Sequence, residues 1–251
     1  MDPGEAKVRI ERFLLAGDLA GARQVAEQFL QSREKSFQDA ALFYSAFCLQ
    51  YHPLDPQPAQ AVSRYQKLLK EHPQSVLREE TLFQLGQCYQ ADPLWPNPEH
   101  AITWYAQLLA EFPQGSRAMR AMYEKGLCQE SVVGNEIQLK EALVTYQGLA
   151  NREDAEPWRT RAIYRQARLK ERLGDTAGAV QDYERFLQMK NRAEQETRRS
   201  EVQMRLAMLL INEMNRVEDG RQLLSALLSE TKDGTWRVVA QQIARRKGTF
   251  E

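Results

Sequence analysis

Apolar residues recur at helical spacing along nearly the whole chain and are interrupted by short breaks at glycine or proline. In the clearest stretch, helices are predicted over about 158–173 and 176–189, with Gly174-Asp175 as the break between them. Pro73 and Pro113 end two other predicted helices, because proline cannot continue a helix and restrains the residue before it. The pattern therefore predicts pairs of helices joined by short connections.

The chain also repeats itself with a period of about 40 residues. The segment YQKLLKEHPQS at 65–75 returns as YAQLLAEFPQG at 105–115. The connector HPLDPQP at 52–58 likewise returns as DPLWPNP at 92–98. Residues 36–75 and 76–115 are therefore near-copies in tandem.

Small residues reveal the more distant copies. They form two series, and a large ring follows most members of the second series after four residues. Small residues on facing helices let the helix axes approach, and the ring one turn later fills the space beside them. The first series is Ala46, Gly86, Gly126, Ala167 and Ala207; the second is Ala22, Ala61, Ala101, Ala142, Ala179 and Gly220, followed by Ala26, Tyr65, Tyr105, Tyr146, Tyr183 and Leu224.

The spacing of Ala61, Tyr65 and Pro73 resembles the tetratricopeptide repeat, a helical hairpin that stacks into arrays. Ala167 and Ala179 are 12 residues apart, as in that family, whereas repeats two to four carry extra residues between their helices. The resemblance implies an all-α fold, a right-handed α-solenoid of about six hairpins plus a C-terminal capping helix. We expect one domain over 1–251, with repeats at about 5–35, 36–75, 76–115, 116–154, 155–194 and 195–231 and the capping helix at 234–247.

The repeat length and the LLxEFPxG-like repeat ends are similar to those of bacterial envelope proteins of this family, namely outer-membrane assembly lipoproteins and Tol-Pal coordinators. This similarity implies a non-enzymatic scaffold or adaptor that binds a partner protein in its concave groove, within an envelope or secretion assembly. Two alternatives stay open. One is a regulatory or chaperone-like module that binds a peptide segment of one client, and the other is an RNA-associated helical repeat.

The resemblance also implies where a partner would bind, because the first helix of each repeat lines the groove in this family. Residues three before the small position form a ladder of large side chains, which either make pockets for a peptide or pack between neighbouring first helices. Arginines on the same face can grip carboxylates or form internal ion pairs. The predicted residues are Phe43, Phe83, Tyr123, Tyr164 and Met204 in the ladder, and Gln87, Gln90, Arg120, Glu130, Arg161, Arg168, Glu171 and Arg172 among the polar side chains.

Charge does not point to nucleic acid. Lys and Arg total 34, as do Asp and Glu, so the formal net charge is zero and no general field attracts phosphate. Basic clusters at 192–199 and 245–247 exist, but Glu194, Glu196 and Glu201 interleave with the first of them. We therefore expect a protein or peptide partner rather than nucleic acid.

No segment approaches the roughly 20 apolar residues that cross a bilayer, and residues 1–10 lack the apolar core of a signal peptide. We expect no transmembrane segment, and membrane association only through a missing N-terminal anchor or a partner. The expected location is periplasmic or envelope if a signal was removed, and cytoplasmic otherwise.

Residues with catalytic or metal-binding potential form no known motif. Cys48, Cys88 and Cys128 are 40 apart, which places them at one position in successive first helices, too far apart for a disulfide. The three histidines show no zinc spacing, and no phosphate loop or nucleophile elbow is present. We expect no enzyme activity, no cofactor and no metal. Trp95, between prolines, is predicted either as an interaction knob on a loop or as a ring folded over its neighbouring repeat.

Overall fold

The computed structural model describes residues 2–32, 34–91, 96–189, 192–230, 237–238 and 240–243. Every regular element in these ranges is a helix, which confirms the predicted all-α fold class. The chain forms two compact units, residues 1–135 and 136–251. The prediction of a single domain over 1–251 stays a prediction. Within the described residues, no helix is long and apolar enough to span a membrane.

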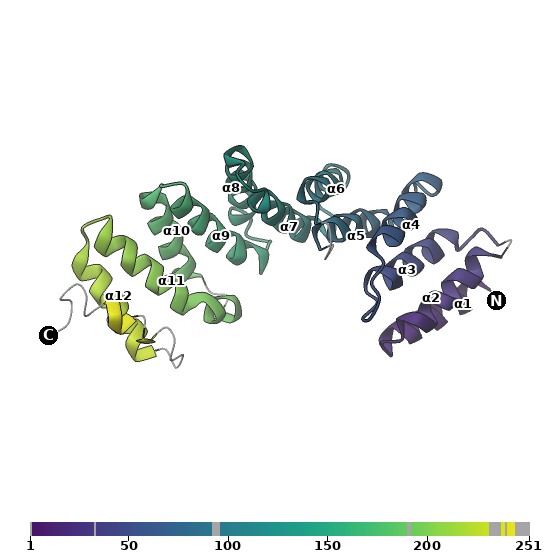
Figure 1. The fold of residues 1–251 in the computed structure, drawn as a ribbon, viewed down its shortest axis with the longest axis horizontal. Helices are drawn as coiled ribbons and strands as arrows, with labels where there is room; N and C mark the ends of the chain where they lie inside the picture. The colour runs from purple at the N-terminus through teal and green to yellow at the C-terminus, as the bar shows by residue number, and fades with distance from the viewer. Residues whose placement is uncertain are drawn as a thin grey trace. The chain divides into compact units, whose positions relative to one another are not determined.

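Unit 1 is a row of helices in which each helix contacts the next one in the chain, and α3 also contacts α5 (Figure 1). Three complete hairpins, α1–α2, α3–α4 and α5–α6, are followed by the first helix of a fourth repeat. The helices are α1 (Pro3–Leu15), α2 (Leu19–Leu30), α3 (Gln38–Gln50), α4 (Pro58–Glu71), α5 (Arg78–Gln90), α6 (Pro98–Glu111) and α7 (Ala118–Ser131).

Unit 2 has the same kind of construction. Consecutive helices are in contact, and the two first helices α9 and α11 also touch. Helices α9 and α10 agree with the expected bounds of repeat five to within one residue at each end. The helices are α8 (Glu136–Ala150), α9 (Trp158–Arg172), α10 (Thr176–Gln188), α11 (Arg192–Asn212) and α12 (Val217–Glu230).

Local signals in the sequence set the helix ends. Asp18 and Asp175 accept a hydrogen bond from the backbone amide three residues later and so cap α2 and α10. Pro58 and Pro98 open α4 and α6, where the missing amide hydrogen of proline is not needed. Gly174 has a φ of +82°, a left-handed conformation that ends α9 and that glycine adopts without strain.

The small residues lie where the helices of a hairpin come closest, as the sequence predicts. A Cβ atom added at Gly86 would overlap the ring of Tyr105, which is fully buried between α5 and α6. The equivalent residues Ala46 and Tyr65 are likewise completely buried in the α3–α4 hairpin. Close approach of the two helices and the ring that fills the adjoining space are therefore parts of one packing arrangement.

A repeated hydrogen bond fixes the same rings. In the α3–α4, α5–α6 and α9–α10 hairpins the ring hydroxyl donates to the side chain that lies four residues after the small position on the first helix. Because the ring is buried, this bond satisfies a polar group that would otherwise be costly to bury. The bonds are Tyr65 to Gln50 at 3.0 Å, Tyr105 to Gln90 at 2.7 Å and Tyr183 to Glu171 at 2.7 Å.

Part of the predicted capping helix is described. Residues 237–238 and 240–243 are helical. Ala240 is completely buried in a cluster with Met204 and Leu224 of the last hairpin, and Ile243 packs against the same cluster. The rest of the predicted 234–247 helix, including Trp236, lies outside the described residues.

Candidate partner-binding face

Each of the first helices α3, α5, α7, α9 and α11 has an accessible stripe. The stripe lies six and two residues before the small position, and one and five residues after it; Gln84 is its one buried member. These offsets follow the helical repeat and place the four side chains on one face. We call this set the first-helix stripe: Ala40, Tyr44, Phe47 and Tyr51 on α3; Glu80, Gln84, Gln87 and Ala91 on α5; Arg120, Glu124, Leu127 and Ser131 on α7; Arg161, Arg165, Arg168 and Arg172 on α9; Glu201, Arg205, Met208 and Asn212 on α11.

The predicted ladder of large side chains lies beside this stripe and is buried. Phe83 is only 1% exposed, and Phe43, Tyr123, Tyr164 and Met204 are also buried. Phe43 packs against Tyr65, and Phe83 against Tyr105, with ring centroids 5.7 and 5.8 Å apart. A partner would therefore meet mainly the neighbouring stripe, and a binding role for the ladder itself stays a prediction.

The stripe on α3 is aromatic. Tyr44 and Phe47 are partly exposed, and Tyr51 is 43% exposed. The rings of Phe47 and Tyr51 lie 4.7 Å apart, and the Tyr51 hydroxyl donates to Gln84 of α5 at 2.9 Å. This end of unit 1 offers large, partly fixed rings, the side chains that most often anchor protein interfaces.

Polar groups cover α5 and α7. Gln87 donates to the Tyr105 hydroxyl, and Gln90 donates to Glu124 of α7 at 2.9 Å. The guanidinium of Arg120 lies 4.9 Å from the centre of the Phe83 ring, and its Nε is 3.7 Å from Glu124. The predicted residues Gln87, Gln90 and Arg120 are thus brought together in one network, while Phe83 lies beneath the Arg120 guanidinium.

Arginines dominate the stripe on α9. Arg168 donates to Glu201 of α11 at 2.8 Å and to the Tyr164 hydroxyl at 2.9 Å. The Arg161 guanidinium lies 4.7 Å from the centre of the Trp158 ring. Arg172 is exposed at the last turn of α9. The structure therefore places all three arginines predicted for this helix on its accessible side.

Glu201 is the centre of the charges in unit 2. One of its carboxylate oxygens accepts hydrogen bonds from Tyr164 at 2.8 Å, Arg168 at 2.8 Å and Arg205 at 2.9 Å. Burial opposes the ionisation of Glu201, but the hydrogen bonds from Arg205 and Tyr164 and the positive charges outweigh it and hold its pKa below the usual value. Glu201 is therefore a firmly held carboxylate among arginines.

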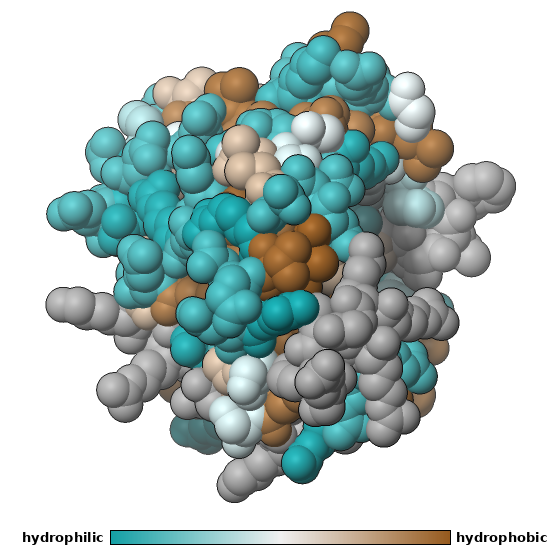
Figure 2. All heavy atoms as spheres, turned by 90° about the vertical axis from the view of Figure 1, so that its left-hand side faces the viewer, coloured by the Kyte–Doolittle hydropathy of each residue, from teal (hydrophilic) through white to brown (hydrophobic). Residues whose placement is uncertain are grey.

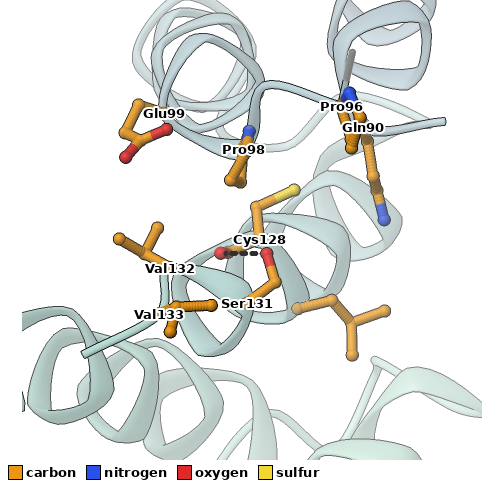
Figure 3. A pocket seen from close by; sticks show the side chains of 9 residues that line it. Gln90, Pro96, Pro98, Glu99, Cys128, Ser131, Val132 and Val133 are labelled. Carbon is orange, nitrogen blue, oxygen red and sulfur yellow. Dashed lines mark hydrogen bonds between the residues drawn. The ribbon is translucent and has the colours of Figure 1, made fainter. Parts of the chain in front are cut away.

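A cavity of about 500 Å³ lies between the start of α6 and the last turn of α7, within unit 1. Figure 3 shows Pro96 and Pro98 on one side and Cys128, Val132 and Val133 on the other. A smaller cavity of about 250 Å³ lies one repeat earlier. Its lining includes Gln50, Pro56, Pro58 and Cys88, which correspond to Gln90, Pro96, Pro98 and Cys128 at a shift of 40 residues. The cavities thus recur with the proline connectors, unlike a single catalytic cleft.

The residue predicted on the connector, Trp95, lies outside the described residues. Among the described side chains, no three or more of the types His, Cys, Asp and Glu cluster so as to hold a metal ion. From the side where α12 lies, Figure 2 shows a mainly hydrophilic surface with small, separated apolar patches. The candidate partner-binding surfaces are the stripes on the first helices.

Comparison with known families tests the repeat assignment. Residues 40–75 and 161–189 match the family model of the tetratricopeptide repeat. These two segments of the chain are tetratricopeptide repeats. The first match covers nearly all of α3 together with α4, and the second covers most of α9 together with α10, so each is one helical hairpin. No protein of curated function matches the sequence.

Solved structures share the fold. A tetratricopeptide repeat protein from Parabacteroides merdae has a TM-score of 0.62 at 15% identity, covering 98% of this chain and 86% of its own. PilW, described as a widely conserved type IV pilus biogenesis factor, has a TM-score of 0.56 at 17% identity, with 92% and 95% covered. A double mutant of MamA scores 0.58 at 16% identity, with 74% and 92% covered. At identities this low, the structural similarity shows a common fold alone.

The repeats differ from one another along their stripes. The position one residue after the small residue holds Phe47, Gln87, Leu127, Arg168 and Met208 in successive repeats, whereas the ring position holds tyrosine in four successive second helices. The aromatic stripe on α3 and Arg165 on α9 were not predicted from the sequence. Tyr44 and Arg165 lie one residue, about 100° of helical turn, from the ladder positions Phe43 and Tyr164, and they take the accessible place that the sequence predicts for the ladder.

Proposed function

We propose that the protein is a non-enzymatic scaffold or adaptor that binds a partner protein through the first-helix stripe positions within its units. The observation that carries this proposal is the contrast between repeated and varied positions. The packing positions hold the same residue types from repeat to repeat, while the accessible stripe changes from aromatic on α3 to arginine on α9. Side chains that vary on a constant scaffold supply specificity, because they alter recognition without disturbing the core.

The chemistry of the stripe supports a protein partner. Rings on α3 can anchor apolar groups, the amides and carboxylates on α5 and α7 can hydrogen-bond a backbone, and the arginines on α9 can pair with acidic side chains. As the setting we propose an envelope or secretion assembly. The pilus biogenesis role stated for PilW, a structure with this fold, and the envelope-like repeat ends of this chain support that setting.

Site-specific photo-crosslinking tests the proposal. A photoreactive amino acid placed at Phe47, Gln87 or Leu127 in the full chain should crosslink to one and the same partner in cells that naturally make the protein. The matched control is Gln66, an exposed residue on the second helix α4, which should give no crosslink to that partner. Crosslinks from Gln66 alone, or none from the three stripe positions, would contradict the proposed binding face.

A further inference from the structure

The accessible side of α9 is a row of four arginines. Arg161, Arg165, Arg168 and Arg172 follow one another at intervals of four, three and four residues and so share one helical face. The residues between them include Ala162, Ile163, Tyr164, Gln166, Ala167 and Leu169, all buried. We call these four residues the arginine row.

Such a row is unfavourable for the helix that carries it. Like charges three or four residues apart repel each other, and a solvated helix face normally mixes both signs. Arg198 and Arg205 of α11 add two more positive charges, with the Arg198 guanidinium 4.4 Å from the centre of the Tyr164 ring. Among the described side chains of these two accessible faces, six arginines accompany two carboxylates, Glu171 and Glu201, so positive charge is in excess in this part of the surface.

The row already shows which group it accepts. The carboxylate of Glu201 sits against Arg168 and Arg205 with short, charge-assisted hydrogen bonds. Glu171 lies within 3.4 Å of Arg205 and also accepts a hydrogen bond from Tyr183. Glu201 therefore pairs with Arg168 of the row, and both Glu171 and Glu201 pair with Arg205 of α11. Arg172 is exposed, and none of the ion pairs among the described residues includes it.

We propose that the arginine row binds an acidic segment of the partner protein, with its carboxylates spaced along the row. This inference rests on the proposed function and names the chemistry of the partner. From Arg161 to Arg172 the row spans about 16 Å at about 1.5 Å per residue, which an extended peptide covers with about five residues. Arginine suits this task because its planar fork meets a carboxylate with two parallel hydrogen bonds.

Nucleic acid fits this surface less well. A phosphate backbone carries a negative charge on every nucleotide and would pass Glu171 and Glu201, which lie beside the row. A peptide can place uncharged residues opposite these carboxylates and acidic residues opposite the arginines. The observations therefore favour the acidic peptide, and the oligonucleotide becomes a competing outcome of the test.

Fluorescence anisotropy with short labelled peptides tests the inference on the full chain. A peptide of alternating Glu and Ser should bind, and the matched peptide of alternating Gln and Ser should not. Arg172→Glu should weaken binding about tenfold or more, and Arg161→Glu should act in the same direction. Arg172→Lys, which keeps the charge but loses the fork, should fall between wild type and Arg172→Glu. Binding should also weaken as salt rises.

The control variant is Arg221→Glu on α12, which makes the same change in net charge at a partly exposed arginine elsewhere in unit 2. Circular dichroism melting of each variant checks that it folds. Equal binding of the Gln peptide, or an effect of Arg221→Glu as large as that of Arg172→Glu, would overturn the inference. So would tighter binding of a single-stranded oligonucleotide of matched charge. If crosslinks from Phe47 persist in the Arg172→Glu variant while peptide binding proves unspecific, the acidic-segment inference fails and the proposed function stands.

Discussion

The Lys170 ammonium lies 2.7 Å from the Asp182 carboxylate and joins α9 to α10 behind the arginine row. The two side chains are only 14% and 9% exposed. The stability of such a buried pair requires both ions, because the loss of one leaves the other as a buried charge without a partner.

We therefore expect Asp182→Ala to destabilise the protein by about 3–5 kcal/mol in chemical unfolding. The control is Glu136→Ala, which removes an ion pair of the same 2.7 Å length whose side chains are 66% and 69% exposed. That variant should change the unfolding midpoint little, because water screens exposed pairs. Equal effects of the two substitutions would show that burial of the Lys170–Asp182 pair does not matter.

Two glycines should respond to alanine in opposite directions. At Gly86 a Cβ meets the buried ring of Tyr105, so Gly86→Ala should destabilise by about 1–3 kcal/mol through overpacking. At Gly148 in α8 a Cβ meets nothing within 4 Å, so Gly148→Ala should stabilise by about 0.5–1 kcal/mol through helix propensity. Urea unfolding of the two variants measures both effects, and a gain in stability at Gly86 would refute the packing described for the small positions.

The thiols should be inert in the folded protein. Cys48, Cys88 and Cys128 are buried, and burial raises the pKa of Cys48 to about 11 and that of Cys128 to about 12. At mildly alkaline pH almost no thiolate exists at these two residues, so a disulfide reagent should react slowly until denaturant is added. Val133→Cys, at a position that is 96% exposed, supplies a rapidly reacting reference thiol. Native thiols that react as fast as this reference would contradict the burial of the cysteine positions.

Glu201 should make stability depend on acid pH. Its pKa in the folded protein lies below the ordinary value of 4.5, so ionised Glu201 stabilises the fold at neutral pH. This contribution is lost as pH falls below about 4.5 through the lowered pKa. The difference in unfolding free energy between wild type and Glu201→Gln should thus be largest near neutral pH and shrink toward about pH 3. A pH-independent difference would show that the hydrogen-bond network does not depend on the charge of Glu201.

The sequence predicts the fold well because the residues that pack the helices together recur at a fixed spacing. Gly86 and Tyr105 meet as the two small-residue series require, and Gly174 ends α9 where the break is predicted. Both outcomes depend on local geometry that a single side chain imposes. Such requirements recur in each hairpin, so the sequence displays them repeatedly.

The binding face is harder to infer because its residues do not recur at a fixed spacing as the packing residues do. Phe43 and Tyr44 are adjacent, both aromatic and both plausible groove residues, yet Phe43 is buried and Tyr44 is partly exposed. The choice between them depends on the angle at which α3 meets its neighbours, which the repeat pattern does not encode. Arg161, Arg168 and Arg172 of α9 are among the residues predicted from the sequence, since charged side chains seldom occupy a core, whereas Arg165 is not.

The bond from Tyr65 to Gln50 lies within one hairpin, as does the equivalent bond from Tyr105 to Gln90. A hairpin copied whole by gene duplication would thus arrive with its internal contacts complete and meet neighbours shaped like its original ones. The similar blocks 36–75 and 76–115 point to such a duplication. The array can therefore gain repeats in evolution without losing packing contacts. The surface residues of each new copy can then change independently and acquire a new binding specificity.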